Sequence, residues 1–208
     1  MRGEIMTTIA ELPPGFADKV LSAQSTFRSV MDAMARPGSV QRIVPMAGTP
    51  GPMMRGAAAI ALTLFDHDTP LWLDARMSES SEVVKWLKFH TGAPVIQDSS
   101  IASFALISDG ALLPALERFA LGTSEYPDRS TTLILQVDSL DAGRGFELRG
   151  PGIDGVATLR ASIKPADLFE RLRVNEALFP RGIDVVLVAD DAVVAIPRTT
   201  RVANKGSE

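Results

Sequence analysis

The chain has 208 residues, of which 46% are hydrophobic and 22% are charged. This length suffices to bury a core without covalent crosslinks. The absence of cysteine excludes disulfides, thiolate catalysis and cysteine-ligated metal sites. A net charge of −4 argues against a broad nucleic-acid surface, and no stretch reaches the ~20 apolar residues of a membrane span. Since a signal-peptide pattern is also missing, we expect a cytoplasmic protein that contacts neither nucleic acid nor membrane.

The first half of the sequence predicts alternating helices and strands. Residues 1–14 are expected to form a disordered start, which the Pro13-Pro14-Gly15 breaker ends. Apolar residues then recur at helical spacing as far as Ala35, namely Phe16, Val20, Ala23, Phe27, Val30, Met31 and Met34. A strand at 41–44, a helix at 53–65 and a strand at 71–73 follow. Ser80 or Ser81 begins a further helix that Gly92 ends, and its inner face carries Val83, Trp86, Leu87 and His90.

The second half predicts the main strands of a sheet. We expect strands at 103–107 and 146–149, helices at 112–121 and 165–178, and a hairpin formed by 185–189 and 193–196. Residues 131–137 (TTLILQV) are apolar enough for a central strand. The resulting prediction is an α/β fold with one domain over residues 15–202. We expect an αβα-type sandwich around a mixed sheet, followed by a flexible tail at 203–208.

Two polar segments contain the only histidines of the chain. Asp66-His67-Asp68-Thr69 could ligate a metal ion or transfer protons, or it could be a polar turn whose aspartates accept bonds from backbone amides. Because no second ligand cluster exists in the sequence, we predict no metal site. His90 lies near a helix end, where the helix dipole is a sufficient structural reason for it and catalysis is the alternative.

Two further segments could bind an anion. Gly143-Arg144-Gly145 and Gly150-Pro151-Gly152, with Arg149 nearby, offer amides and guanidinium groups to a phosphate, or they simply form turns. Arg198-Thr199-Thr200 follows the last predicted strand, where it can bind a ligand or cap the backbone. Motifs of nucleotide-binding folds and serine nucleophiles are absent, and no lysine is an obvious Schiff-base residue.

Seven segments, in this order and spacing, resemble one known family. They are FRSVMDAMARPG (27–38), LFDHDTPLWL (64–73), FHTGAP (89–94), TLILQV (132–137), GPGI (150–153), FPRGID (179–184) and AIPRTT (195–200). Together they resemble the PhnH family, a subunit of the carbon–phosphorus lyase system of bacterial phosphonate breakdown. The similarity runs from about Phe16 to Thr200, nearly the whole chain.

The resemblance implies a fold similar to the large domain of pyridoxal-phosphate-dependent transferases, without that cofactor or its site. It also implies homodimers of the isolated protein and a core complex with the sister subunits G, I and J. In the family, the G, H and I subunits support replacement of the adenine of MgATP by a phosphonate, which gives alpha-D-ribose 1-phosphonate 5-triphosphate. MgATP is then a substrate of the complex, and this chain is expected to be a non-autonomous subunit without an assigned catalytic residue.

The polar residues of the matched motifs are the candidates for ligand or interface contacts: Arg28, Arg36, Asp66, Asp68, His90, Asp184, Arg198 and Thr199. Their arginines would hold a phosphonate or polyphosphate through charge-assisted bonds. In the alternative, the motifs shape turns or a subunit interface, and the chain is a scaffold without an active-site contribution. A free-standing pyridoxal-phosphate enzyme is the third hypothesis.

Overall fold

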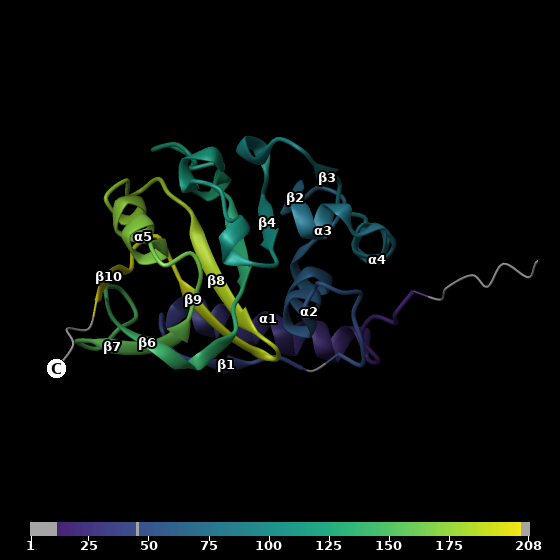
Figure 1. Cartoon of the computed structure of the whole chain (residues 1–208), viewed down its shortest axis with the longest axis horizontal. Coiled ribbons are helices and arrows are strands. Elements are labelled where there is room, and N and C mark those ends of the chain that lie inside the picture. Colours follow the sequence, from purple (N-terminus) through teal and green to yellow (C-terminus); the bar gives the residue numbers. More distant parts are fainter. Residues whose placement is uncertain (1–11, 45, 205–208) are drawn as a thin grey trace, which may run out of the picture.

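A computed structural model describes residues 12–44 and 46–204, and its helices and strands alternate along the chain (Figure 1). The helices are α1 (Lys19–Ala35), α2 (Arg55–Leu64), α3 (Ala75–Glu79), α4 (Ser81–Thr91) and α5 (Leu168–Glu176). Short 3-10 turns are η1 (Ser99–Ile101), η2 (Gly110–Leu112), η3 (Leu116–Arg118) and η4 (Pro127–Arg129). The strands are β1 (Gln41–Arg42), β2 (Leu71–Leu73), β3 (Val95–Ile96), β4 (Phe104–Ile107), β5 (Thr132–Gln136), β6 (Ser139–Arg149), β7 (Ala157–Ser162), β8 (Asp184–Ala189), β9 (Ala192–Ile196) and β10 (Arg201–Asn204).

The main sheet has seven strands in the order β1-β9-β8-β5-β4-β2-β3. The strands from β3 to β8 in that order run parallel, while β9 is antiparallel to β8 and β1 is antiparallel to β9. The predicted mixed sheet and the predicted β8–β9 hairpin are therefore confirmed. The apolar strand β5 lies near the middle of the sheet, as its composition predicts.

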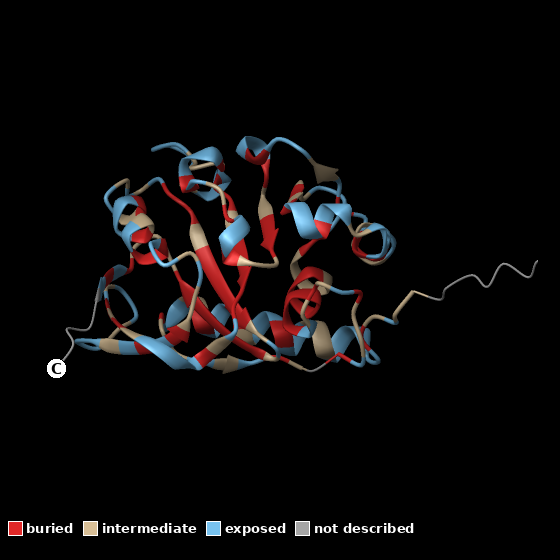
Figure 2. Cartoon of the chain, in the orientation of Figure 1, coloured by how far each residue is buried: buried red, intermediate tan, exposed pale blue. Residues whose placement is uncertain are grey.

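The main sheet is buried on both faces, which Figure 2 shows as a central group of red strands. Alternate residues of one strand belong to different cores: Ile134 packs with residues of α1, α2 and α4, and Leu133 packs with residues of α5 and the second sheet. That second sheet has the order β10-β6-β7. The αβα expectation is therefore corrected for one face, because a small antiparallel sheet and α5 take the place of a purely helical layer.

Several segments differ from the sequence prediction, which also missed α3 and β3. The expected helix at 112–121 is wrong, since the only helical structure in this segment is the last residue of η2 and the turn η3. Pro114 between them has no N–H and disfavours helical geometry in the residue before it, which separates the two turns. The strands β7 and β10 were not predicted, and the expected strand at 146–149 is the end of the longer β6. Their mixed polar residues and glycines carry a weak strand signal.

Helix α1 begins later than predicted, at Lys19, because the Asp18 carboxylate caps it by accepting a bond from the Leu21 N–H at 2.9 Å. Its apolar pattern is also wider than its buried face. Val30 is buried, whereas Phe27 and Met31 are 47% and 49% exposed. One apolar side of α1 is thus left uncovered by the other residues that the structure describes.

The predicted disordered start and flexible tail fall mostly on residues outside the described ranges. Among the described residues, no helix is long and apolar enough to cross a bilayer.

Candidate functional site

The carboxyl ends of β2, β4 and β5 lie at one edge of the sheet, where α/β proteins commonly bind ligands. Asp74 is fully buried there and accepts bonds from the Met77 N–H at 2.9 Å and the Ser108 Oγ at 2.7 Å. Gln136 accepts a bond from the Met54 N–H at 2.7 Å. At this edge of the sheet, Asp74 and Gln136 therefore form their hydrogen bonds with other groups of the protein. Asp74 and Gln136 were not predicted as site residues. A polar side chain within or directly after an apolar strand could have indicated them.

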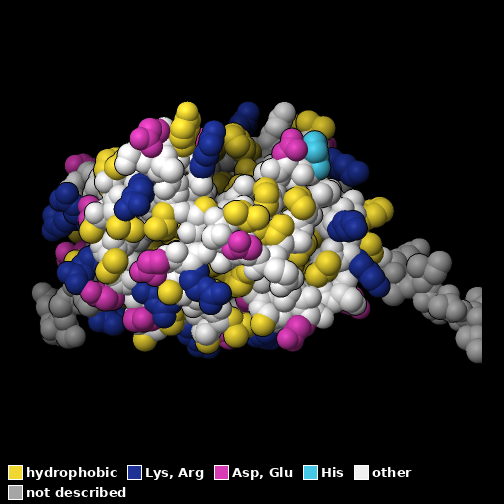
Figure 3. Space-filling model, turned by 90° about the horizontal axis from the view of Figure 1, so that it is seen from above, with side chains coloured by type: hydrophobic (Ala, Val, Ile, Leu, Met, Phe, Trp, Pro, Cys, Tyr) yellow, Lys and Arg dark blue, Asp and Glu magenta, His cyan; other side chains and the backbone are white. Residues whose placement is uncertain are grey.

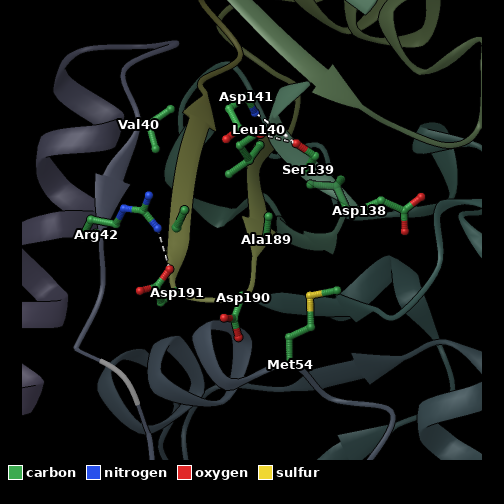
Figure 4. Close-up of a pocket in the computed structure, with 12 residues that line it drawn as sticks. Val40, Arg42, Met54, Asp138, Ser139, Leu140, Asp141, Ala189, Asp190 and Asp191 are labelled. Carbon is green, nitrogen blue, oxygen red and sulfur yellow. Dashed lines mark hydrogen bonds and ion pairs between the residues drawn. The ribbon is translucent and has the colours of Figure 1, made fainter. Parts of the chain in front are cut away.

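A cavity of ≈390 Å³ lies beside the β8–β9 turn (Figure 4). Four of its lining residues are the aspartates Asp138, Asp141, Asp190 and Asp191. Arg42 also lines it, and its Nη1 lies 2.6 Å from Asp191 Oδ1. The carboxylates would repel a phosphate. Figure 4 shows the Asp138 carboxylate pointing away from the others, and no group of three metal-ligating side chains is placed to hold a metal among the described residues.

The predicted candidates Asp184 and Arg198 form a nearly buried ion pair, with side chains 15% and 13% exposed. Asp184 begins β8 and Arg198 follows β9, so the pair joins the two open ends of this hairpin. Arg198 Nη1 donates to the Pro127 carbonyl at 2.6 Å, and Nη2 donates to Ser130 Oγ at 2.6 Å. The Arg198 N–H also donates to Asp184 Oδ1 at 2.8 Å. Protein groups thus occupy the Arg198 guanidinium, which favours a structural role.

A second cavity of ≈390 Å³ lies between the end of α5 and the β6–β10 strand pair. We name it the arginine pocket, and it is lined by Arg149, Gly150, Pro151, Glu176, Phe179, Thr199 and Arg201. Thr199 is one of the predicted candidates, and Arg149 and Gly150 belong to the glycine-rich segment predicted as an anion site or a turn. Gly150–Gly152 forms a turn at the edge of this pocket, so both interpretations stay open for that part. Gly143-Arg144-Gly145, in contrast, lies within strand β6 and does not form the predicted turn.

The two arginines of the pocket are directly opposite each other in the β6–β10 pairing. Each has one carboxylate nearby: Arg201 Nε lies 3.2 Å from Glu176 Oε1, and Arg149 Nη2 lies 3.8 Å from Glu147 Oε2. Their side chains are 76% and 59% exposed, so both guanidinium groups are accessible to solvent. Arg201 was not predicted, because only the strand register reveals that it lies beside Arg149.

His90 serves to hold the segment that precedes α1. Its Nε2 lies 3.3 Å from the Pro13 carbonyl, which also accepts a bond from Trp86 Nε1 at 2.8 Å. The His90 ring packs against the rings of Trp86 and Phe89, with centroids 4.6 and 5.0 Å away. These contacts give His90 a structural explanation, and neither histidine bonds to a hydroxyl group within the described ranges.

The Asp66–Thr69 segment is a hydrogen-bonded turn. Asp66 Oδ1 accepts a bond from the Asp68 N–H at 2.9 Å, and Thr69 Oγ1 donates to the Asp66 carbonyl at 2.9 Å. Asp68 lies at the surface with its carboxylate 3.4 Å from His67 Nε2. This geometry favours the polar-turn interpretation of the segment.

The remaining candidates lie on α1 or directly after its end. Arg28 is exposed and lines a shallow hollow with Phe27. Arg36 pairs with Asp32 one turn earlier, at 3.1 Å. The structure therefore brings only Asp184, Arg198 and Thr199 into one neighbourhood and distributes the other candidates over α1, α4 and the α2–β2 loop.

The pKa shifts that the structure supports lie outside both cavities. The Ser100 hydroxyl lowers the pKa of Asp98 by hydrogen bonding, and Arg171 does the same to Asp167. On α5 the Arg173 guanidinium lowers the pKa of Glu170, and the carboxylate in turn raises the pKa of Arg173. None of these groups lines the arginine pocket or the aspartate-lined cavity.

The structure is that of an α/β protein with a mixed seven-stranded sheet and a small antiparallel sheet. Two arginines of the small sheet form an exposed pair. The family model described as bacterial phosphonate metabolism protein (PhnH) matches residues 14–203. The chain belongs to this family.

Two relatives extend this finding. The alpha-D-ribose 1-methylphosphonate 5-triphosphate synthase subunit PhnH of Rhizobium meliloti (strain 1021) is 46% identical, over 94% of this chain and 98% of the relative. The putative C-P lyase subunit protein HtxG of Stutzerimonas stutzeri is 30% identical, over 97% of both chains. The predicted family resemblance is confirmed.

Proposed function

We propose that the chain is the H-type subunit of a synthase that forms alpha-D-ribose 1-methylphosphonate 5-triphosphate in phosphonate breakdown. The observation that carries this proposal is the 46% identity to a subunit of that name, over almost the full length of both chains. In the reaction the phosphonate replaces the adenine of MgATP, and the G and I subunits take part.

The test is reconstitution with the G and I subunits of the same organism. Adenine release from MgATP is measured in the presence of methylphosphonate, with and without this chain. We expect phosphonate-dependent release only when the chain is present. An equal rate without the chain, or no release from the full set, would contradict the proposal.

The site geometry supports a non-autonomous subunit. Neither histidine bonds to a hydroxyl among the described residues, and the most buried ion pair among them, Asp184–Arg198, is occupied by protein contacts. A role confined to scaffolding is the alternative. It predicts that substitutions on an interface abolish the reaction, while substitutions in the arginine pocket leave the rate unchanged.

A subunit needs a surface for its partners, and α1 offers one. Val20, Phe27 and Met31 lie on one side of this helix at 65%, 47% and 49% exposure. Their spacing of seven and four residues places them in one row. The upper face of the molecule also shows hydrophobic side chains, but they are interspersed with charged ones (Figure 3). We propose that the uncovered side of α1 contacts the sister subunits G, I and J.

The matched experiment compares Phe27→Glu with Val174→Glu, because both residues are 47% exposed and lie on helices. We expect Phe27→Glu to abolish co-elution with the G, I and J subunits and Val174→Glu to leave it intact. The native mass of the isolated wild-type chain tests the proposed homodimer. Loss of co-elution in both variants, or in neither, would contradict the assignment of this surface.

The similarity to pyridoxal-phosphate transferases is proposed for the fold alone, without the cofactor. All four lysines of the described residues, Lys19, Lys85, Lys88 and Lys164, are exposed at the surface, whereas a Schiff-base lysine needs a pocket. Adding pyridoxal phosphate should therefore produce no specific lysine-bound absorbance band. We propose a cytoplasmic location, where MgATP is available.

A further inference from the structure

The arginine pocket places two like charges, Arg149 and Arg201, next to each other on paired strands. Arg149 and Arg201 are cross-strand partners, so their Cβ atoms lie roughly 4.5–5.5 Å apart. Like charges at such positions destabilise a strand pair. Glu147 and Glu176 offset part of this repulsion, but each approaches only one edge of a guanidinium group. A bound anion would remove the remaining repulsion.

The geometry suits a phosphate more than a carboxylate. Two adjacent guanidinium forks can each donate to a different oxygen of one phosphate group or of neighbouring groups. Glu176 contacts Nε of Arg201, and both Nη atoms of Arg201 are without a protein partner among the described residues. Thr199 belongs to the same lining, and a threonine hydroxyl can donate one more bond.

Two apolar residues also line the pocket. Phe179 is 61% exposed although a phenylalanine gains by burial, and Pro151 lines the cavity beside Gly150. Gly150 adopts φ = +141°, and a Cβ there would come within 2.9 Å of the Thr199 carbonyl. Glycine thus allows the turn that carries Pro151 to approach Thr199 closely at the edge of the cavity.

We propose that the arginine pocket binds a nucleoside phosphate, with the phosphates on Arg149 and Arg201 and the base stacked on Phe179. The cavity of ≈390 Å³ lies within the usual range of small-molecule pockets, roughly 300–1,000 Å³. An exposed aromatic ring is a stacking surface for any base, so the pocket selects the class and not the identity of the nucleoside. This inference goes beyond the proposed function, which requires no nucleotide on this subunit.

The test is calorimetric titration of the whole chain with ATP, inorganic tripolyphosphate and adenosine. We expect ATP to bind with Kd of about 1 mM or tighter. Arg201→Gln should weaken both ATP and tripolyphosphate about tenfold, because a charge-assisted bond is lost. Phe179→Ala should weaken ATP about tenfold and change tripolyphosphate less than about twofold, because only ATP stacks.

Arg173→Gln is the matched control, since it removes the same charge from an exposed arginine of α5 outside the pocket. It should change the ATP affinity less than about twofold. Unchanged thermal midpoints establish that each variant is folded. If Arg201→Gln is unstable, Arg149→Gln takes its place.

Three results would overturn the proposal: no ATP binding at millimolar concentration, equal weakening by Arg173→Gln and Arg201→Gln, or equal weakening of ATP and tripolyphosphate by Phe179→Ala. The last result would reduce the site to a simple polyphosphate site. Because the titration uses the isolated chain, a negative result leaves the reconstitution experiment with the G and I subunits unaffected.

Discussion

Arg198 and Arg201 lie three residues apart in the sequence, yet the structure gives them opposite environments. The Arg198 side chain is 13% exposed and donates to Asp184, Pro127 and Ser130. The Arg201 side chain is 76% exposed and bonds only to Glu176 among the described residues. The turn at 197–200 separates them. Arg198 follows β9 of the main sheet, whereas Arg201 begins β10 of the small sheet. An arginine in a family motif is therefore not by itself evidence of a ligand contact.

The largest expected effect comes from Arg198→Ala. Removing the guanidinium leaves the Asp184 carboxylate nearly buried without its partner, which costs about 3–5 kcal/mol of the free energy of unfolding. Urea denaturation of the wild type and the variant measures this difference. Arg198→Lys is the control, because it keeps the charge and should lose less. A change below about 1 kcal/mol for Arg198→Ala would contradict the structural role.

Gly150→Ala is expected to have an intermediate effect. Alanine at φ = +141° is strained, and its Cβ would come within 2.9 Å of the Thr199 carbonyl. A strained backbone position of this kind costs about 1–3 kcal/mol. Gly48→Ala is the control, since a Cβ there meets no atom within 4 Å. Equal urea midpoints of the two variants would show that the close approach of the turn is not needed.

Arg201→Gln is expected to change stability little, by less than about 1 kcal/mol, because an exposed ion pair contributes little. The variant also loses the repulsion between Arg201 and Arg149, which raises the free energy of unfolding and offsets part of the loss. The same urea series measures it beside the corresponding Arg198→Gln, which should be far less stable. Similar losses in both variants would erase the distinction between the buried and the exposed arginine.

The smallest expected effect is a pH dependence at α5. Hydrogen bonding by the Arg173 guanidinium holds the pKa of Glu170 below its ordinary value of 4.5. A carboxyl whose pKa is lowered by folding stabilises the protein above its unfolded pKa, and this contribution disappears as the pH falls through the folded pKa. Thermal midpoints of the wild type and Glu170→Gln should therefore differ above pH 4.5 and converge in stronger acid. A constant difference over this range would contradict the assignment.

Much of the main sheet could be predicted from the sequence, because strands such as β5 and the β8–β9 hairpin are apolar runs bounded by strong turn residues. The same local signals predicted α4 and its glycine end. The small sheet could not be predicted, because β7 and β10 gain stability from pairing with β6 and carry little hydrophobic periodicity of their own.

The residues of the arginine pocket were likewise only partly predictable from the sequence. Thr199, Arg149 and Gly150 were predicted from a strand end and a glycine-rich turn, which are local features. Phe179 lay within a matched motif but was not singled out, and Arg201 was not predicted at all. Their contribution to the arginine pocket depends on the β6–β10 register and on the end of α5, and neither is visible as a spacing in the chain.

By itself, the sequence determined the family, the α/β class, the apolar strands of the main sheet and the residues that stop its helices. These properties depend on residue type and short-range periodicity. Only the tertiary structure decided which arginine is buried with a carboxylate and which faces a cavity, and which apolar side of α1 the described residues leave exposed. Burial and ion pairing depend on residues far apart in the chain, so their outcome is set by the packing of the whole fold.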